Sequence, residues 1–199
     1  MKKTVVTITS HAIPLDTQNV DTDQILPARY LKATTRVGFG EKLFRDLRFD
    51  AQDQPRPEFV LNNPAFTGVI LIAGHNFGGG SSREHAAWAL GDYGFTAVVS
   101  SFFGDIFKAN ALGNSLLPVE VTKPFLRQLF DIVTRDPDTI IEISVEAQTI
   151  AVPNHGLTQT FEIQPYKKIC LMNGYDDIDY LVSMTGRIAG FENSRKDDY

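Results

Sequence analysis

The middle of the chain, residues 68–121, alternates between short apolar runs and stretches that carry apolar residues at helical spacing. Each apolar run has the length of a buried strand, and each stretch between two runs has the length of a short helix. The pattern therefore predicts three strands with two helices between them, which is typical of a parallel sheet. The strands are expected at 68–73, 95–101 and 116–121, and the helices at 82–91 and 104–113.

On both sides of this region, apolar and polar residues alternate singly, which is the pattern of strands with one buried face. TVVTITS at 4–10 predicts a first strand. The segments 139–152 and 159–164 alternate in the same way, and we expect them to pair through the turn at 153–158. The chain is therefore expected to carry β structure in addition to the parallel sheet.

Helical spacing returns in three further segments, which predict helices at 41–49, 124–136 and 177–190. The segment 11–40 is rich in turn formers and predicts a long loop. Residues 191–199 are polar and are expected to form a frayed tail. Together, the patterns predict one compact mixed α/β domain, 1–199.

Composition narrows the classes of function. The 199 residues are 43% hydrophobic and 22% charged, which is ordinary for a soluble globular protein. The net charge of −5 disfavours nucleic acid as the main partner, because proteins that bind along a nucleic-acid phosphate backbone are usually basic. A single cysteine, Cys170, excludes an internal disulfide and a metal site built on several thiolates. No apolar run has the length of a signal peptide or of a membrane span, so we expect a cytoplasmic protein without a membrane partner.

Candidate chemistry is concentrated in GHNFGGGSSREHAAWAL, residues 74–90, where the predicted strand crosses to the predicted helix. Gly78, Gly79 and Gly80 allow close approach of the backbone to a ligand, and the N–H groups at the start of the helix attract anions. Arg83 adds a planar donor suited to a carboxylate or phosphate. An alternative interpretation is purely structural, because Ser81-x-x-Glu84 fits a capping box. A nucleotide P-loop is disfavoured, since no Gly-Lys-Ser/Thr follows the glycines.

Three stretches together resemble one family. NFGGGSSREHAAWAL (76–90) resembles the serine-serine-arginine loop of the aconitase superfamily in its separate small-subunit form. NVDTDQILPARYLK (19–32) and SSFFGDIFKANALGNSLLPVEV (100–121) resemble two further signatures, in the same order. The closest family is the small subunit of 3-isopropylmalate dehydratase, and the resemblance runs over nearly the full length. The chain departs from it by having Gly79 where cysteine is usual and Ala87 where proline is common.

The resemblance implies a fold, a reaction and a partner. The implied fold is a swivelling β/β/α three-layer domain that docks on a separate large subunit. The implied reaction is that of a hydro-lyase of leucine biosynthesis, which interconverts 2-isopropylmalate and 3-isopropylmalate through 2-isopropylmaleate and is active only in the heterodimer. The large subunit is expected to carry a [4Fe–4S] cluster, and this chain is expected to bind neither cofactor nor metal.

The resemblance also assigns roles to residues. Ser81 is expected to be the base that removes a proton next to a carboxylate, and Ser82 and Arg83 are expected to bind a substrate carboxylate. Leu31 and Lys32 fall in the loop that sets selectivity, where Leu31 suits an isopropyl group and Lys32 a carboxylate. Asn76 is expected to shape the glycine loop. Related small subunits acting on homoaconitate or on methylmalate and citraconate, and a stand-alone anion-binding module, remain alternatives.

Several other residues invite a functional interpretation beside a plainer one. Asp21 and Asp23 suggest a metal, but carboxylates in such a loop usually bond to their own backbone. His85 lies within the motif and is expected to pack locally, whereas His75 either lines the site or simply ends a strand. Trp88 and Cys170 are expected in the core.

Overall fold

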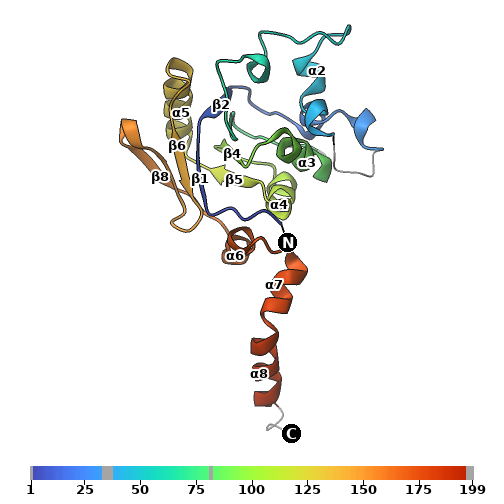
Figure 1. The fold of residues 1–199 in the computed structure, drawn as a ribbon, viewed down its shortest axis with the longest axis vertical. Coiled ribbons are helices and arrows are strands. Elements are labelled where there is room, and N and C mark those ends of the chain that lie inside the picture. Colours follow the sequence, from blue (N-terminus) through green and yellow to red (C-terminus); the bar gives the residue numbers. More distant parts are fainter. Residues whose placement is uncertain (1, 33–37, 81–82, 196–199) are drawn as a thin grey trace.

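The computed structural model describes residues 2–32, 38–80 and 83–195, and its core is two four-stranded sheets packed face to face. Helices α3 and α4 cover the other face of one of these sheets, so the layers are β, β and α (Figure 1). This arrangement confirms the mixed α/β class and the three layers expected from the sequence.

The parallel sheet is the central layer, with strand order β2-β3-β4-β5. Alternate side chains of β3 enter opposite layers. Ile70 and Ile72 join the apolar cluster between the sheets, whereas Leu71 and Ala73 join the cluster under the helices. The three strands and two helices predicted for residues 68–121 are confirmed. The elements are β2 (Ala12–Leu15), β3 (Ile70–Ala73), α3 (Glu84–Tyr93), β4 (Ala97–Ser100), α4 (Asp105–Gly113) and β5 (Leu117–Glu120).

The antiparallel sheet has the order β1-β6-β7-β8. The single strand predicted at 139–152 is wrong, because the chain reverses within it: Ser144 lies opposite Thr149, and Gln148 has a φ of 55°. The turn at 145–148 contains neither glycine nor proline, so nothing in the sequence marked it. The predicted pairing across the following turn is confirmed by β7 and β8. The strands are β1 (Thr7–Ser10), β6 (Ile141–Ser144), β7 (Thr149–Val152) and β8 (Leu157–Thr160).

The predicted first strand is present as β1, but the chain continues directly into β2, which the sequence pattern did not predict. β1 pairs with β6 and β2 pairs with β3, so the chain changes sheets at His11. Pro14 lies inside β2, where it cannot donate a ladder hydrogen bond. It is tolerated because β2 is an edge strand of its sheet.

The helix predicted at 41–49 is also wrong in its extent. The segment forms a 3-10 turn, η2 (Gly40–Lys42), and a four-residue helix, α2 (Arg45–Arg48). Phe44, between them, has a φ of 51°. Leu43 and Phe44 are both fully buried in the cluster under the helices, and their burial overrides the helical preference of the segment.

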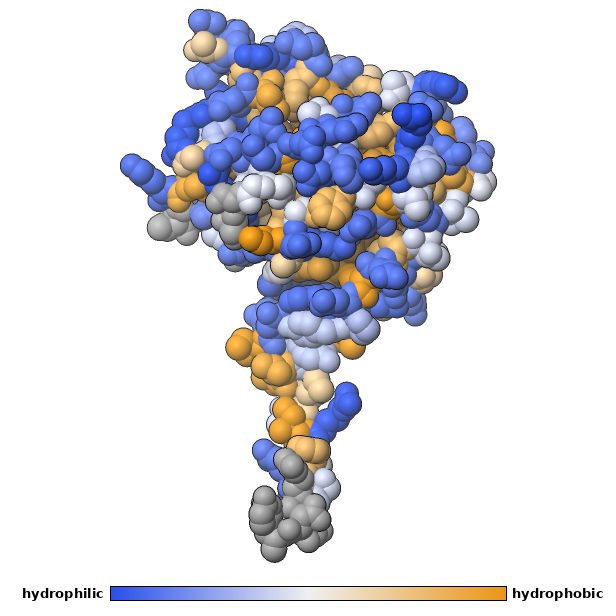
Figure 2. Space-filling model, turned by 180° about the vertical axis from the view of Figure 1, so that it is seen from behind, coloured by the Kyte–Doolittle hydropathy of each residue, from blue (hydrophilic) through white to orange (hydrophobic). Residues whose placement is uncertain are grey.

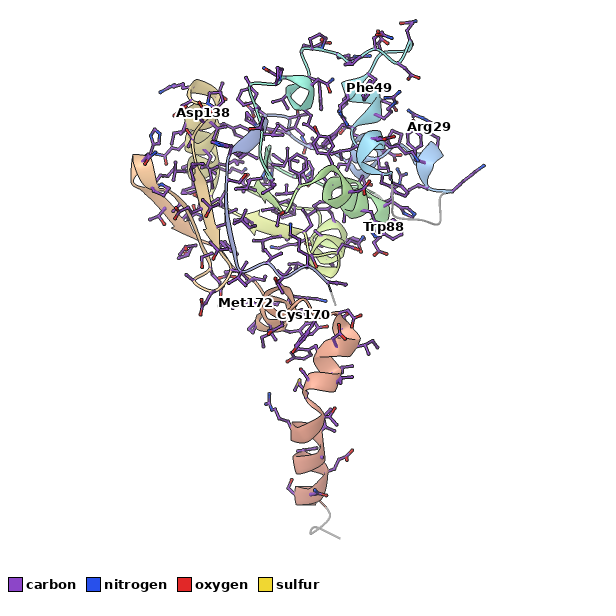
Figure 3. The ribbon with its side chains drawn as sticks, viewed as in Figure 1. Arg29, Phe49, Trp88, Asp138, Cys170 and Met172 are labelled. Carbon is purple, nitrogen blue, oxygen red and sulfur yellow. The ribbon has the colours of Figure 1, made fainter. Side chains whose placement is uncertain are left out.

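The remaining helices complete the body and extend beyond it. The helix predicted at 124–136 is confirmed as α5 (Lys123–Arg135), which packs against β2 and β3. α6 (Pro165–Asn173) was not predicted and buries Cys170 (Figure 3). The helix predicted at 177–190 is present as α7 (Asp177–Ser183) and α8 (Thr185–Arg195), which project away from the body (Figure 1). α8 therefore includes the first five residues of the predicted tail. In the described part of the chain, every helix is too short or too polar to cross a membrane.

Candidate functional site

The glycine crossing, residues 74–80, leaves β3 at the carboxyl edge of the parallel sheet and runs between two other segments of that edge. On one side, the N–H of Gly78 donates to the carbonyl of Val20 (2.7 Å), and the N–H of Thr22 donates to the carbonyl of Gly79 (3.1 Å). On the other side, Phe77 forms a parallel bridge with Phe103. Backbone groups from the loops after β2 and β4 therefore hold the crossing in place.

The three consecutive glycines are not equivalent. Gly78 has a φ of 75°, and a Cβ there would lie 2.3 Å from Cγ of Phe107. Gly80 has a φ of 86°, but a Cβ there would meet nothing closer than 3.6 Å. At Gly79 the φ is ordinary, and a Cβ would lie 3.6 Å from the side chain of Asn76. At position 78 the fold requires glycine both for its backbone conformation and for lack of space. At position 80 it requires glycine for conformation alone, and at position 79 for neither reason.

Asn76 and Asn19 face each other where two of these loops meet. Both have positive φ, 61° and 55° respectively. The side-chain amide of Asn76 donates to Oδ1 of Asn19 (2.9 Å), and the N–H of Asn19 donates to the carbonyl of His75 (2.8 Å). Asn76 thus ties the crossing to the segment after β2 through its side chain.

Arg83 is the N-cap of α3 and forms an ion pair with Asp23. Its backbone is extended (φ −135°), and Nη1 contacts Oδ1 of Asp23. The Arg83 side chain is only 14% exposed, whereas that of Asp23 is 53% exposed. The donor that suits a carboxylate therefore has one beside it, supplied by the loop after β2. Ser81 and Ser82 lie outside the described residues.

The capping-box interpretation of Ser81-x-x-Glu84 depends on Ser81, which lies outside the described residues, and the helix itself begins later than that interpretation needs. Because Arg83 is the N-cap, Glu84 is the first residue of the helix and not its third. The Glu84 carboxylate instead accepts hydrogen bonds from the indole of Trp88 (3.1 Å) and the side-chain amide of Asn114 (3.0 Å). A true capping box is found at Asp21, whose carboxylate accepts from the N–H of Gln24 in α1 (Thr22–Ile25), as expected for a turn-forming carboxylate.

A cavity of about 940 Å³ opens at the same edge of the sheet, between α5 and the loops after β2, β3 and β4. His75 lines it, with Nδ1 3.1 Å from Oγ of Ser101. Lys123 and Arg127, one turn apart on α5, line it as well. Clefts outside the carboxyl ends of parallel strands are common ligand sites. The remaining charged residues of the lining are Asp16 and Asp131.

The other residues singled out from the sequence pack in the core or at its edge. His85 packs against the rings of Phe39 and Trp88, at centroid distances of 5.6 and 4.4 Å, which confirms local packing. Trp88 is half-buried at the edge of the cluster under the helices, so it is less enclosed than expected. Cys170 is buried, as expected.

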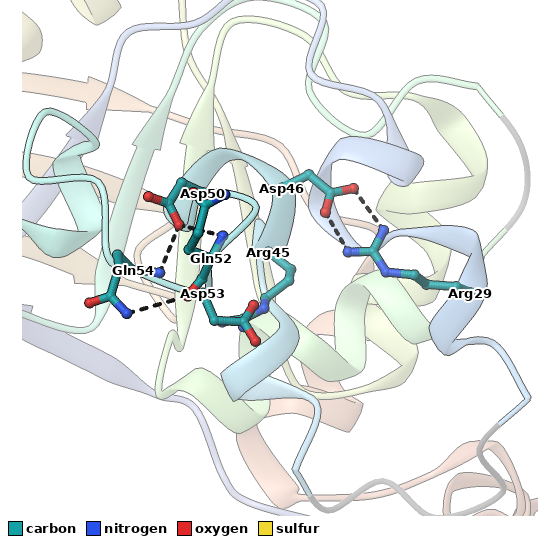
Figure 4. Close-up of polar contacts among 7 residues, drawn as sticks. All are labelled: Arg29, Arg45, Asp46, Asp50, Gln52, Asp53 and Gln54. Atoms are coloured by element: carbon teal, nitrogen blue, oxygen red, sulfur yellow. Dashed lines mark hydrogen bonds and ion pairs between the residues drawn. The ribbon is translucent and has the colours of Figure 1, made fainter.

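The segment that carries Leu31 and Lys32 is fixed to α2 on the outer side of the body. Arg29 donates two hydrogen bonds to the carboxylate of Asp46, one of them 2.8 Å long (Figure 4). These bonds raise the pKa of Arg29 and lower the pKa of Asp46. Leu31 packs partly buried against the cluster under the helices, and Lys32 is exposed. The expected selectivity loop therefore starts from an anchored base, and 33–37 lie outside the described residues.

Two parts of this geometry were missed in the sequence analysis. The contact between Asp23 and Arg83 joins positions sixty residues apart, and a single sequence carries no signal of such a pairing. The sequence did contain a signal for Lys123 and Arg127, because their spacing places both side chains on one face of a helix. The described residues contain no group of three or more His, Cys, Asp or Glu side chains that could hold a metal ion.

Comparison with known proteins identifies relatives over almost the whole chain. The family model described as the aconitase C-terminal domain matches residues 2–124, which include the glycine crossing and both segments beside it. The 3-isopropylmalate dehydratase small subunit of Christiangramia forsetii is 56% identical over 191 residues, covering 96% of this chain and 93% of that protein. The protein of the same name from Cytophaga hutchinsonii is 51% identical, covering 96% of this chain and 95% of that protein.

The fold also has a counterpart among solved structures. A crystal structure of 3-isopropylmalate dehydratase from Methanocaldococcus jannaschii matches with a TM-score of 0.63 at 25% identity. The match covers 96% of this chain and 99% of that one.

Proposed function

The chain belongs to the aconitase C-terminal domain family and to its 3-isopropylmalate dehydratase small subunits, and from this premise we propose its part in the reaction. The enzyme is a hydro-lyase that interconverts 2-isopropylmalate and 3-isopropylmalate through 2-isopropylmaleate, in leucine biosynthesis. In this proposal the small subunit supplies the base and the groups that bind the substrate carboxylate. The observation that carries it is Arg83, held at the end of the glycine crossing with a carboxylate already against it.

The ion pair with Asp23 supports a carboxylate as the ligand of Arg83. The guanidinium is mostly buried, and its partner is a more exposed aspartate from another loop. A substrate carboxylate has the same chemistry as that aspartate and can take its place on the planar donor. Substrate binding at Arg83 is then an exchange of one carboxylate for another, with Ser82 as a further donor.

Ser81 is the proposed base, and its hydroxyl must be made far more acidic than usual. An ordinary hydroxyl has a pKa near that of bulk water, far above neutrality. Lowering it to neutrality corresponds to roughly 11 kcal/mol. The dipole of α3 contributes at most ~2 kcal/mol, whereas each preorganised donor contributes ~3 kcal/mol. Several converging donors are therefore necessary, which is why the base follows a stretch of glycines and precedes an arginine.

These donors reach that strength only when water is excluded, so the proposed site needs a cover. Two large apolar side chains are exposed beside the crossing: Phe102, 43% exposed, and Ile106, 50% exposed. Phe102 lies against the ring of His75, at the start of the crossing. Exposed apolar side chains beside a polar site support closure by a partner protein, and we propose the large subunit in that role.

The [4Fe–4S] cluster is assigned to the large subunit. The residues of this chain do not fit such a group, since clusters of this type are held by several thiolates and Cys170 is buried in α6. The proposal also places the heterodimer in the cytoplasm, and it leaves substrate selectivity to Leu31 and Lys32 on the anchored loop.

Reconstitution tests the proposal directly. The chain is combined with its large subunit and assayed with 2-isopropylmalate, homoaconitate and methylmalate. We expect turnover of 2-isopropylmalate to exceed that of the others by at least about tenfold, since an apolar contact discriminates by ~1–3 kcal/mol. Ser81→Ala is expected to bind substrate without turnover. Arg83→Ala is expected to raise KM and lower kcat, because it removes a carboxylate ligand. Activity of the small subunit alone, or unchanged turnover by Ser81→Ala, would contradict the assignment.

A further inference from the structure

α7 and α8, residues 177–195, form a C-terminal arm that projects from the body beside α6 (Figures 1 and 3). Its base is anchored to α6. The Asp177 carboxylate accepts hydrogen bonds from the hydroxyl of Tyr166 and from Nζ of Lys167, the latter at 2.9 Å. The rings of Tyr166 and Tyr180 meet edge to face at 4.6 Å. These contacts lie in the first half of α7, so the arm leaves the body at a defined position.

One side of the arm carries large apolar side chains in contact with solvent. Ile178, Leu181 and Val182 are 68%, 56% and 66% exposed, and Ile188 in α8 is 44% exposed. The spacing of Ile178, Leu181 and Val182 places them along one side of α7, and Ile188 follows further along the arm in α8. We call these four residues the apolar stripe. Figure 2 shows apolar side chains along the arm. A helix of this length is marginal in water by itself, so a stripe of this kind is a surface to be covered.

We propose that the apolar stripe of the arm docks on the large subunit, an inference that rests on the proposed function. A second copy of this chain is the competing occupant. The small contact area that two paired arms would offer argues against a dimer of this kind. Residues 177–195 form a rod about 28 Å long and about 10 Å wide. Its footprint of roughly 280 Å² is far below the ~800 Å² per partner of a stable interface. A large subunit that also covers the glycine crossing supplies the missing area, whereas pairing of arms alone does not.

The arm is also part of the chain that relatives named as small subunits share. The match to the Christiangramia forsetii small subunit leaves at most eight of the 199 residues unmatched. Eight residues are fewer than the arm contains, so more than half of the arm lies within the matched length. A partner common to proteins of that name is therefore the occupant to expect.

The test compares the full chain with the variant Ile178→Ser/Leu181→Ser/Val182→Ser. Binding to the large subunit is measured by titration, and turnover of 2-isopropylmalate is measured at saturating large subunit. We expect Kd to rise at least about 30-fold, as for a cluster of buried anchor residues, with kcat unchanged. Val6→Ser, at an apolar residue of the body that is 38% exposed, is the matched control and should leave Kd unchanged.

The triple variant could lose its helix, so a second measurement uses the wild-type chain. It compares amide hydrogen exchange in the isolated chain and in the complex. Amides of 177–195 are expected to exchange at least about tenfold more slowly in the complex than in the isolated chain. Unchanged exchange, or an unchanged Kd in the triple variant, would overturn the docking proposal. So would a wild-type chain that is dimeric alone and becomes monomeric in the triple variant. A complex that protects the arm but does not turn over 2-isopropylmalate would contradict the proposed function and leave the docking intact.

Discussion

Alanine substitution at each of the three consecutive glycines should give three different results, although the residues are adjacent. At Gly78, the new Cβ would lie 2.3 Å from Cγ and 2.6 Å from Cβ of Phe107. Rotation of the ring cannot relieve the second contact, because that atom is fixed to the backbone of α4. Phe107 is 2% exposed and packs edge to face with Phe77, so the ring has no space to move into.

The magnitude for Gly78→Ala follows from two costs. A left-handed backbone costs a residue with a Cβ roughly 1–2 kcal/mol. Overpacking of a filled core costs roughly 1–3 kcal/mol. The free energy of unfolding should therefore fall by about 2–5 kcal/mol, which for a chain of this size lowers Tm by about 4–20 °C.

The neighbouring glycines are the matched controls. Gly80→Ala brings the conformational cost without a close contact, so a loss of about 1–2 kcal/mol is expected. Gly79→Ala brings neither cost and should be neutral or stabilising by up to ~1 kcal/mol, because alanine reduces the freedom of the unfolded chain. Thermal and urea denaturation of the three variants measures the series. A Gly79→Ala variant as unstable as Gly78→Ala would refute the reasoning.

Three further outcomes are expected. Ser100→Ala should lower the free energy of unfolding by about 1–3 kcal/mol in urea denaturation, because the buried hydroxyl donates to the carbonyl of Gly74 (2.7 Å) and that carbonyl would lose its partner; an unchanged midpoint would contradict this. Asp23→Asn should lower KM for 2-isopropylmalate in the reconstituted enzyme, since the substrate no longer competes with a carboxylate for Arg83; a raised KM would mean that Asp23 orients Arg83 instead. Burial raises the pKa of the Cys170 thiol, so alkylation by iodoacetamide between pH 8 and 9 should be slower in the native chain than in guanidinium. That raised pKa stabilises the fold below the thiol's unfolded value and ceases to do so as pH rises through the folded value, and equal alkylation rates would argue against it.

The parallel half of the fold was predictable because its pattern is local. Each strand of residues 68–121 is an apolar run, and each helix between two strands has its own period. The hairpin between β6 and β7 was not predictable in this way, since Gln148 adopts a positive φ without a residue type that signals it. β2 was missed because Pro14 indicates a loop, unless the strand is already known to lie at an edge.

The candidate site was likewise predictable only in part. The residue types of the glycine crossing indicated an anion site, and Arg83 does have a carboxylate beside it. That this carboxylate belongs to Asp23 depends on the pairing of loops after β2 and β3, which only the fold establishes. Arg83 was expected inside the first turn of α3 and proved to be its N-cap, because the extended backbone of the crossing continues through that residue. The roles of Ser81 and Ser82 stay predictions.

The position of β1 has a consequence for how this chain is made. β1 leaves the ribosome well before its partner β6, which comes more than 130 residues later. At ~5–20 residues per second, translation takes about 7–26 s to cover that distance. The parallel sheet and its helices are synthesised entirely between β1 and β6, so they can assemble before the partner of β1 exists. A nascent chain released before residue 141 would retain β1 with no antiparallel strand to pair with, and Ile8 would lose its cover.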